Sequence, residues 1–116
     1  MPDHDLNARI GAKMGLKNIV SRKVIGLVGY QPTYLNSGNE RCLVPDFSHD
    51  IAAAFSVVER LRAAGFFWRG KWSSEQMSFI FNLHNDWEYY GDTTELPLTI
   101  CRAADEIPVE LWEAKS

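Results

Sequence analysis

The feature that most constrains this sequence is a change of hydrophobic period on either side of Gly65. From Ser48 to Ala64 the apolar residues recur at helical spacing, and Ser48 or Asp50 is placed to cap the first turn. From Met77 to Leu83 apolar side chains alternate with more polar ones, which is typical of a strand with one buried face. A helix followed by strands of this kind predicts a mixed α+β domain.

Helices elsewhere are indicated by their own start and stop signals. Residues 6–14 carry one narrow apolar stripe and are followed by Gly15, which predicts a first helix that ends there. A last helix is expected to begin near Pro97 and to end before Pro108, because proline is favoured in a first turn and breaks a helix farther along.

The remaining segments predict strands and a loop. Residues 17–30 hold two β-branched runs separated by polar residues, which indicates a hairpin. The runs at 66–68 and 77–83 indicate an antiparallel pair of strands. Residues 31–42 are rich in turn-forming residues and have no apolar period, so they predict a loop.

Together these elements predict a single α+β domain over residues 1–116. An antiparallel sheet of about four strands would be covered by three helices, as an α/β/α sandwich. Residues 106–116 would form a short turn or a frayed tail. A chain of this length hides roughly 65% of the surface that it exposes when unfolded, which is enough for a core without metal or disulfide bonds.

Charge and hydropathy exclude several classes of protein. Twelve Lys and Arg against fifteen Asp and Glu give a net charge of −3, which is too acidic for a protein that neutralises many phosphates. No hydrophobic run approaches the roughly 18 residues of a membrane span, and residues 1–5 lack the basic start of a signal peptide. We therefore expect a soluble intracellular protein with no membrane partner and no direct contact with nucleic acid.

Residue types that carry metal or covalent chemistry are few and scattered. His4, His49 and His84 are not within ligand spacing of one another or of a cysteine, so no metal site is expected. Cys42 and Cys101 each have an apolar neighbour and are interpreted as small buried hydrophobic residues. The glycines form no phosphate-binding loop. Neither a cofactor nor a catalytic residue is predicted.

One alternative is a small enzyme or ligand-binding domain that uses Asp46, His49 and Asp50 together with the 31–42 loop. Carboxylates and a histidine at a helix start could form an acid–base pair. The favoured interpretation is that the carboxylates cap the following helix and interact with its dipole.

The best candidate site is aromatic and acidic. Tyr and Trp are enriched at protein-binding surfaces, and here they lie among acidic residues at the tip of the predicted hairpin and after its second strand. The predicted partner-binding residues are Trp72, Asp86, Trp87, Glu88, Tyr89, Tyr90 and Asp92. Exposed aromatic residues would serve equally in self-association, so a homo-oligomer stays an alternative.

A further alternative is the binding of single-stranded nucleic acid. Arg60, Arg62, Arg69 and Lys71 lie near Trp68 in the sequence, and aromatic rings beside cations can stack on bases. The acidic residues between 86 and 95 oppose this function. Protein binding is therefore the favoured interpretation.

Two blocks of the sequence resemble one known family. The first is Val-Pro-Asp-Phe-Ser-His-Asp at 44–50, followed by Ala-Ala-Phe at 53–55, and the second is Leu-Pro-Leu-Thr-Ile-Cys-Arg-Ala-Ala at 96–104. These blocks, in this order, resemble the phage ABA-sandwich family, and the likeness extends over residues 4–105. Thr99 and Asp105 depart from the family pattern, which more often has Ala and Leu at these places.

The resemblance implies a small α/β/α layered domain encoded by phages or prophages, without an established enzymatic activity or agreed catalytic residues. Joined to the acidic aromatic stretch, it predicts a non-enzymatic protein that docks on a host protein in the host cytoplasm. The expected kind of partner is a defence component such as a CRISPR effector, which would make the protein an inhibitor of the anti-CRISPR kind. An acidic aromatic surface could occupy a basic nucleic-acid groove and speed the encounter.

Overall fold

The computed structural model describes residues 4–73, 75–83 and 87–112, with the backbone alone at Trp72 and Trp87. These ranges form three α-helices, two three-stranded antiparallel sheets and a short 3-10 helix. In chain order the elements are α1 (His4–Lys13), β1 (Lys17–Lys23), β2 (Tyr30–Leu35), β3 (Arg41–Leu43), α2 (Ile51–Ala63), β4 (Phe67–Trp72), β5 (Met77–Leu83), β6 (Trp87–Thr93), α3 (Leu96–Asp105) and η1 (Val109–Trp112).

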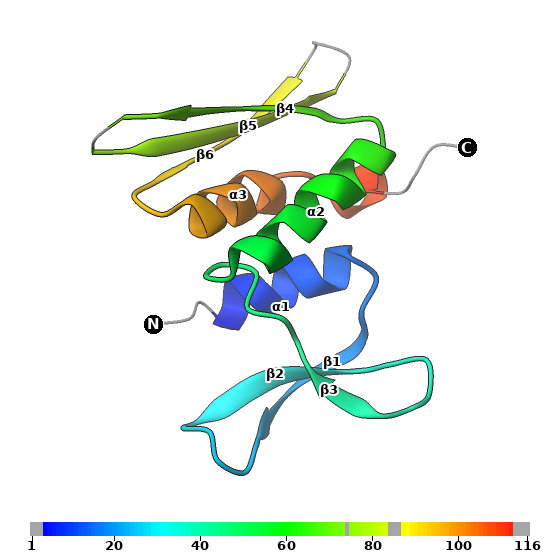
Figure 1. The fold of residues 1–116 in the computed structure, drawn as a ribbon. Helices are drawn as coiled ribbons and strands as arrows, with labels where there is room; N and C mark the ends of the chain where they lie inside the picture. Colours follow the sequence, from blue (N-terminus) through cyan, green and yellow to red (C-terminus); the bar gives the residue numbers. More distant parts are fainter. Residues whose placement is uncertain (1–3, 74, 84–86, 113–116) are drawn as a thin grey trace.

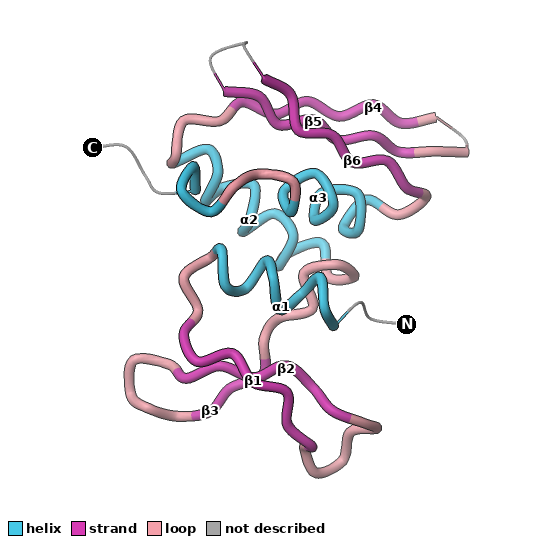
Figure 2. Tube along the Cα trace, turned by 180° about the vertical axis from the view of Figure 1, so that it is seen from behind, coloured by secondary structure: helices cyan, strands magenta, loops and turns pink. Residues whose placement is uncertain are grey.

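The helices form a middle layer between the two sheets (Figures 1 and 2). On one side α2 and α3 pack against the sheet of order β4-β5-β6, which we call the second sheet. On the other side α1 contacts α3 and also strands β1 and β2 of the first sheet, whose order is β1-β2-β3. One cluster of buried apolar residues extends from α1 through the helical layer to the inner side of β5.

Local signals in the sequence explain the helices. Asp50 caps α2, because its side chain accepts a hydrogen bond from the backbone N–H of Ala52 at 3.0 Å. Gly65 follows the helix with φ +103°, a backbone conformation that glycine adopts without strain. Pro97 lies in the first turn of α3, as expected. The three predicted helices are therefore confirmed, with ends shifted by a few residues.

The first sheet departs from the sequence-based expectation. The hairpin expected within 17–30, with polar residues 21–23 between its two strands, is wrong in its bounds: β1 runs through these residues to Lys23, residues 24–29 form the turn, and the second strand is β2. The prediction of a loop over residues 31–42 is wrong, because most of β2 and the start of β3 lie there. Only the connection around Asn36 is a turn, held by its side-chain oxygen, which accepts from the N–H groups of Gly38 and Glu40 at 2.9 Å each.

The second sheet contains the antiparallel pair that the alternation at 77–83 predicts, with Trp68 opposite Phe81 and Gly70 opposite Phe79. It also contains a third strand, β6, in the polar and aromatic stretch that was not expected to be a strand. At Gly91 the backbone of α3 comes so close that a Cβ atom would lie 2.7 Å from the amide nitrogen of Ala103. Strand β6 is thus held directly against α3.

The number and order of layers also differ from the prediction. Instead of one sheet of about four strands covered by helices, the chain has two three-stranded sheets with the helices between them. The apolar stripe of a helix shows that one face is buried, but it does not show whether the covering layer is a sheet or another helix. The α+β class is confirmed, and the α/β/α order of layers is not.

The segment expected to be a turn or a frayed tail is short but packed. Residues 109–112 form η1, and Trp112 is only 1% exposed. Its indole Nε1 donates a hydrogen bond to the carbonyl oxygen of Ile107 at 3.1 Å. The chain therefore contributes a large aromatic ring to the core after α3 has ended.

Candidate functional site

The side of the second sheet that faces away from the helices carries nine side chains in three rows. Because successive residues of a strand point to opposite faces, the register places on this side Phe67, Asn82 and Glu88, then Arg69, Ile80 and Tyr90, and then Lys71, Ser78 and Asp92. We call this surface the outer face. The described helices all lie on the other side of the second sheet (Figures 1 and 2).

Large apolar surface is exposed on the outer face. Phe67 is 67% exposed and Tyr90 is 51% exposed, although both are aromatic residues in regular strands. Ile80 lies between Arg69 and Tyr90 in the register and is itself buried. The outer face therefore presents rings that flank a covered aliphatic centre.

Polar contacts fix several side chains of this surface. The guanidinium Nη2 of Arg69 lies 3.0 Å from Glu88 Oε1, in an exposed ion pair. The hydroxyl of Tyr90 donates to Asp92 Oδ2 at 3.0 Å and lies 3.2 Å from the hydroxyl of Ser78. The other carboxylate oxygen of Asp92 is shielded from solvent and has no hydrogen-bond partner among the described residues. These contacts restrict the positions of Arg69, Glu88 and Tyr90 on the outer face.

The predicted partner-binding residues divide between two sides of the sheet. Glu88, Tyr90 and Asp92 share the outer face, whereas the ring of Tyr89 lies inside, 6.2 Å from the ring of Phe66. Trp72 is the last residue of β4 and Trp87 the first of β6, and their side chains lie outside the described part of the structure, as does all of Asp86. The prediction missed Phe67 and Arg69, which the register brings beside Glu88 and Tyr90.

Trp68 and Arg69, two of the residues that suggested nucleic-acid binding, form contacts within the protein. Trp68 points inward, where its ring stacks on Phe79 with centroids 5.0 Å apart and meets Phe55 of α2 edge-on at 6.2 Å. Arg69 is paired with Glu88. Trp68 is still 39% exposed, but one face of its ring is already covered by Phe79 and does not offer a platform to a base.

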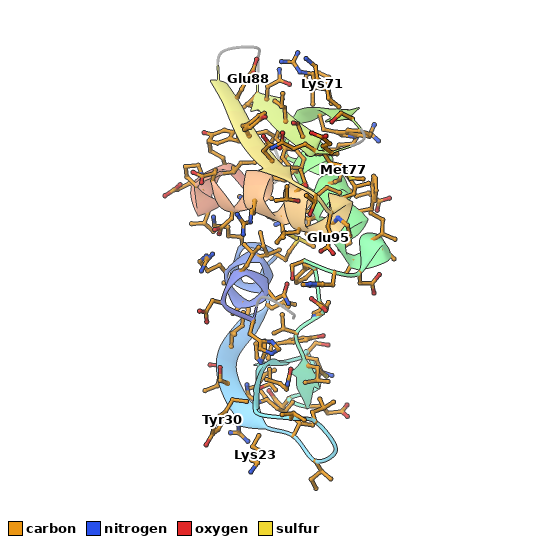
Figure 3. The ribbon with its side chains drawn as sticks, turned by 90° about the vertical axis from the view of Figure 1, so that its left-hand side faces the viewer. Lys23, Tyr30, Lys71, Met77, Glu88 and Glu95 are labelled. Atoms are coloured by element: carbon orange, nitrogen blue, oxygen red, sulfur yellow. The ribbon has the colours of Figure 1, made fainter. Side chains whose placement is uncertain are left out.

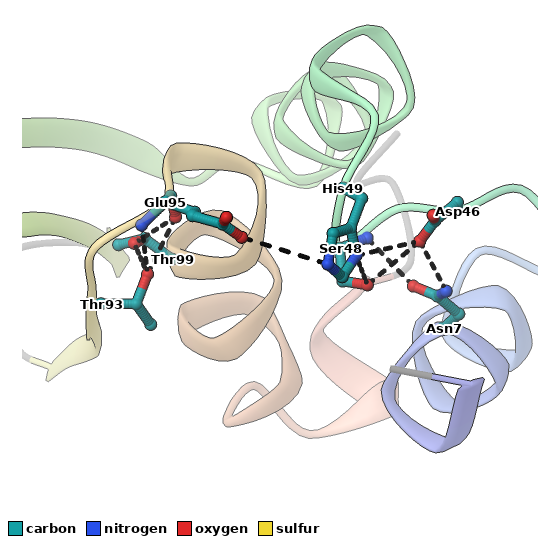
Figure 4. Close-up of polar contacts among 7 residues, drawn as sticks. All are labelled: Asn7, Asp46, Ser48, His49, Thr93, Glu95 and Thr99. Atoms are coloured by element: carbon teal, nitrogen blue, oxygen red, sulfur yellow. Dashed lines mark hydrogen bonds and ion pairs between the residues drawn. The ribbon is translucent and has the colours of Figure 1, made fainter. Parts of the chain in front are cut away.

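The residues of the enzyme alternative form a polar network at the start of α2 (Figure 4). Asp46 Oδ1 accepts from the Asn7 amide at 2.9 Å and from the Ser48 hydroxyl at 3.1 Å, and it lies 3.4 Å from His49 Nδ1. His49 Nδ1 is 3.0 Å from the Ser48 hydroxyl, and its Nε2 is 4.0 Å from Glu95. The structure thus brings Asp46 and His49 together, while Asp50 caps the helix.

This network has the residue types of a nucleophile, a base and an acid. The side chains of His49 and Asp46 are 31% and 40% exposed, but the hydroxyl that would be the nucleophile is not accessible. The Ser48 side chain is fully buried, and its hydroxyl can donate its proton to Asp46. A hollow of about 300 Å³ lies nearby, and the residues that line it include His4, Asn7 and Asp46, but neither Ser48 nor His49. A nucleophile must be within reach of a substrate. The arrangement instead ties the segment before α2 to helix α1.

Asn7 of α1 makes this connection. It is 2% exposed, and both its side-chain nitrogen and its side-chain oxygen form hydrogen bonds. It donates to Asp46 and accepts from the backbone N–H of Ser48 at 3.0 Å. We expect Asn7→Ala to lower the free energy of unfolding by about 2 kcal/mol, because it leaves a buried N–H without a partner. Urea denaturation followed by circular dichroism measures the loss. His49→Ala is the control, with an expected change of about 0.5 kcal/mol or less, and equal effects of the two substitutions would contradict this account.

The two cysteines are both free. Cys101 is fully buried in α3, as predicted, whereas Cys42 in β3 is only half-buried and lies 3.5 Å from the side-chain nitrogen of Asn36. Within the described ranges no three His, Cys, Asp or Glu side chains come together in a way that could hold a metal ion. None of the described helices combines the length and apolar character that crossing a membrane requires.

The fold and this surface define a small α+β domain in which the described helices leave one face of the second sheet uncovered. Residues 18–104, about three quarters of the chain, match the family model of the Phage ABA sandwich domain. The chain belongs to this family, which confirms the resemblance of its two sequence blocks and makes it a phage-associated protein. No curated protein and no solved structure matches the chain.

Proposed function

We propose that this chain is a non-enzymatic, phage- or prophage-encoded binding protein that docks on a host protein in the host cytoplasm through the outer face. The observation that carries the proposal is the exposure of Phe67 and Tyr90 on either side of the Arg69–Glu88 pair. Tyr and Arg dominate the binding energy of protein interfaces, and a flat face of ordered side chains loses little entropy when it binds. A defence component, such as a CRISPR effector, is the partner class that the phage origin favours.

The charges of the outer face refine the kind of partner. Glu88 and Asp92 are accompanied on the same face by Arg69 and Lys71, so the described part of the surface is balanced and not acidic. The described part of the outer face therefore does not mimic the negative charge of nucleic acid, and charge alone contributes little to binding of the partner. We infer that the partner offers apolar pockets for the rings of Phe67 and Tyr90, with polar groups around them.

The test uses a double substitution of the two exposed rings. Tagged protein captures its partner from host lysate, mass spectrometry identifies that partner, and calorimetry on the purified pair gives the dissociation constant. Phe67→Ser with Tyr90→Ala is expected to weaken binding at least about a hundredfold. Each ring is expected to contribute about 2 kcal/mol, and a loss of about 1.4 kcal/mol raises the dissociation constant tenfold.

Two controls separate this function from its alternatives. Ile51→Ser removes an aliphatic residue of α2 that is 45% exposed and lies away from the outer face, and it is expected to leave binding unchanged. His49→Ala reduces function only if the enzyme or ligand-binding alternative is correct. Capture that survives the double substitution but fails with His49→Ala would refute the proposal. A change from dimer to monomer in the double variant would assign the outer face to self-association.

A further inference from the structure

The turn between β1 and β2 exposes a cluster of aliphatic side chains at the end of the molecule remote from the outer face. Ile25 is fully exposed and Val28 is 96% exposed, while Leu27 and the nearby Tyr30 also remain largely uncovered. Figure 3 shows Lys23 and Tyr30 at the end opposite to Lys71 and Glu88. Single exposed apolar residues are common on soluble proteins, but a contiguous group usually marks a contact surface.

Basic side chains surround this hairpin tip, which we define as residues 24–30. A groove of about 380 Å³ beside it is lined by apolar Val24, Ile25 and Leu43 and by three cations, namely Arg22, Lys23 and Arg41. From 17 to 39 the sequence has no Asp or Glu. Among the described residues, neither Arg22 nor Lys23 forms an ion pair. The surface that fits here is therefore both apolar and anionic.

Two carbonyl groups of the hairpin tip accept hydrogen bonds within the protein. The N–H of Leu27 donates to the carbonyl oxygen of Val24 at 3.1 Å, and the side-chain amide of Gln31 donates to the carbonyl oxygen of Val28 at 3.0 Å. The backbone groups of Ile25 and Gly26 have no such partner among the described residues, so it is the apolar side chains of the tip, and not its backbone, that are suited to leave water. From Val24 to Gly29 no side chain carries a hydrogen-bonding group. Side chains of this kind suit an environment without hydrogen-bonding partners, such as the acyl boundary of a bilayer.

We propose that the hairpin tip inserts into the interfacial layer of an anionic lipid bilayer. Ile25 and Val28 enter the acyl boundary, Tyr30 lies at the headgroups, and the cations beside the groove meet lipid phosphates. Two tips of this chain would bring like charges together, which disfavours a second copy as the occupant. Anchoring by one short turn is weak and reversible. The inference does not depend on the proposed docking function, which uses the other end of the molecule.

Vesicle sedimentation with the full chain tests the inference. Wild type is expected to bind vesicles of phosphatidylcholine and phosphatidylglycerol in equal parts, to bind pure phosphatidylcholine much less, and to lose affinity as salt rises. Ile25→Ser with Val28→Ser is expected to reduce binding to the anionic vesicles by about tenfold or more, because it removes the inserted aliphatic groups. Arg22→Gln with Lys23→Gln is expected to abolish the preference for phosphatidylglycerol.

The controls keep a failure here distinct from a failure of the docking function. Phe67→Ser with Tyr90→Ala is expected to bind vesicles as wild type does, and circular dichroism verifies that each variant folds. Absence of binding to the anionic vesicles, or binding that is unaffected by the two serine substitutions, overturns the proposal. If those substitutions instead abolish capture of a host protein or dissociate a dimer, the hairpin tip is a protein interface, and the lipid assignment is wrong.

Discussion

Trp112→Ala is expected to lower the free energy of unfolding by about 3–5 kcal/mol, the range measured when a buried tryptophan or phenylalanine is truncated. The indole is 1% exposed and belongs to the main apolar cluster of the protein. Its removal leaves a cavity and deprives the carbonyl oxygen of Ile107 of the donor that now lies 3.1 Å away. Such a loss is a large fraction of the about 5–15 kcal/mol that stabilises a typical domain.

Urea denaturation followed by far-ultraviolet circular dichroism measures this effect. Val109→Ala is the matched control, because Val109 lies in the same 3-10 helix but is 53% exposed. Its expected cost is within about 0.5 kcal/mol, as for other surface substitutions. If the two variants were equally stable, Trp112 would not be packed as described and the core would end with α3.

Gly91→Ala is expected to cost about 3 kcal/mol, the upper part of the range for overpacking. The added methyl group would collide with the carbonyl oxygen of Thr99 and would lie 2.7 Å from the amide nitrogen of Ala103. Both atoms belong to the backbone of α3, so no side-chain rotation relieves the clash. Either β6 must move away from the helix or α3 must shift as a whole.

The melting temperature reports this loss directly, and a decrease of roughly 10 °C is expected for a domain of this size. Gly38→Ala is the control, because its Cβ would lie 3.4 Å from the Asn36 side chain, at the edge of ordinary contact. A Gly91→Ala variant that melts with the wild type would show that α3 does not approach β6 so closely. If the Gly91→Ala variant lost partner binding as well as stability, the contact between β6 and α3 would be required to keep the outer face in its binding conformation.

The elements that could be predicted from the sequence are those whose causes are local. The cap at Asp50, the left-handed Gly65 and the early Pro97 each act within a few residues, so the helices were found. Strand β5 was found because its inner residues alternate with polar ones along a single strand. Such signals need no knowledge of the rest of the chain.

The missed elements depend on contacts between distant segments. Strand β2 contains Pro32 although it is the central strand of the first sheet, a place that proline normally avoids. The carbonyl oxygen of Pro32 still accepts from the N–H of Val44 at 3.0 Å, a contact that no local pattern predicts. The order of the layers was missed for the same reason, since α1 contacts both another helix and the first sheet.

The structure separates the predicted site residues, because Glu88, Tyr90 and Asp92 lie together on the outer face whereas Tyr89 lies on the inner side. Consecutive residues of a strand cannot all face one side, so the run that includes Glu88, Tyr89 and Tyr90 had to divide between two surfaces. Recognising β6 as a strand would have separated Tyr89 from its neighbours. Phe67 and Arg69 could not be added from the sequence alone, because only the register between strands brings them beside β6.

The helices, as the middle layer, separate two sheets whose far ends point in opposite directions (Figure 3). If both proposed contacts form, a protein of this shape would act as a bivalent spacer, since one end could hold a surface while the other searches for a target. Restricting the search to a thin zone beside that surface raises the effective concentration of the target, so that modest affinities at each end combine into a strong avidity.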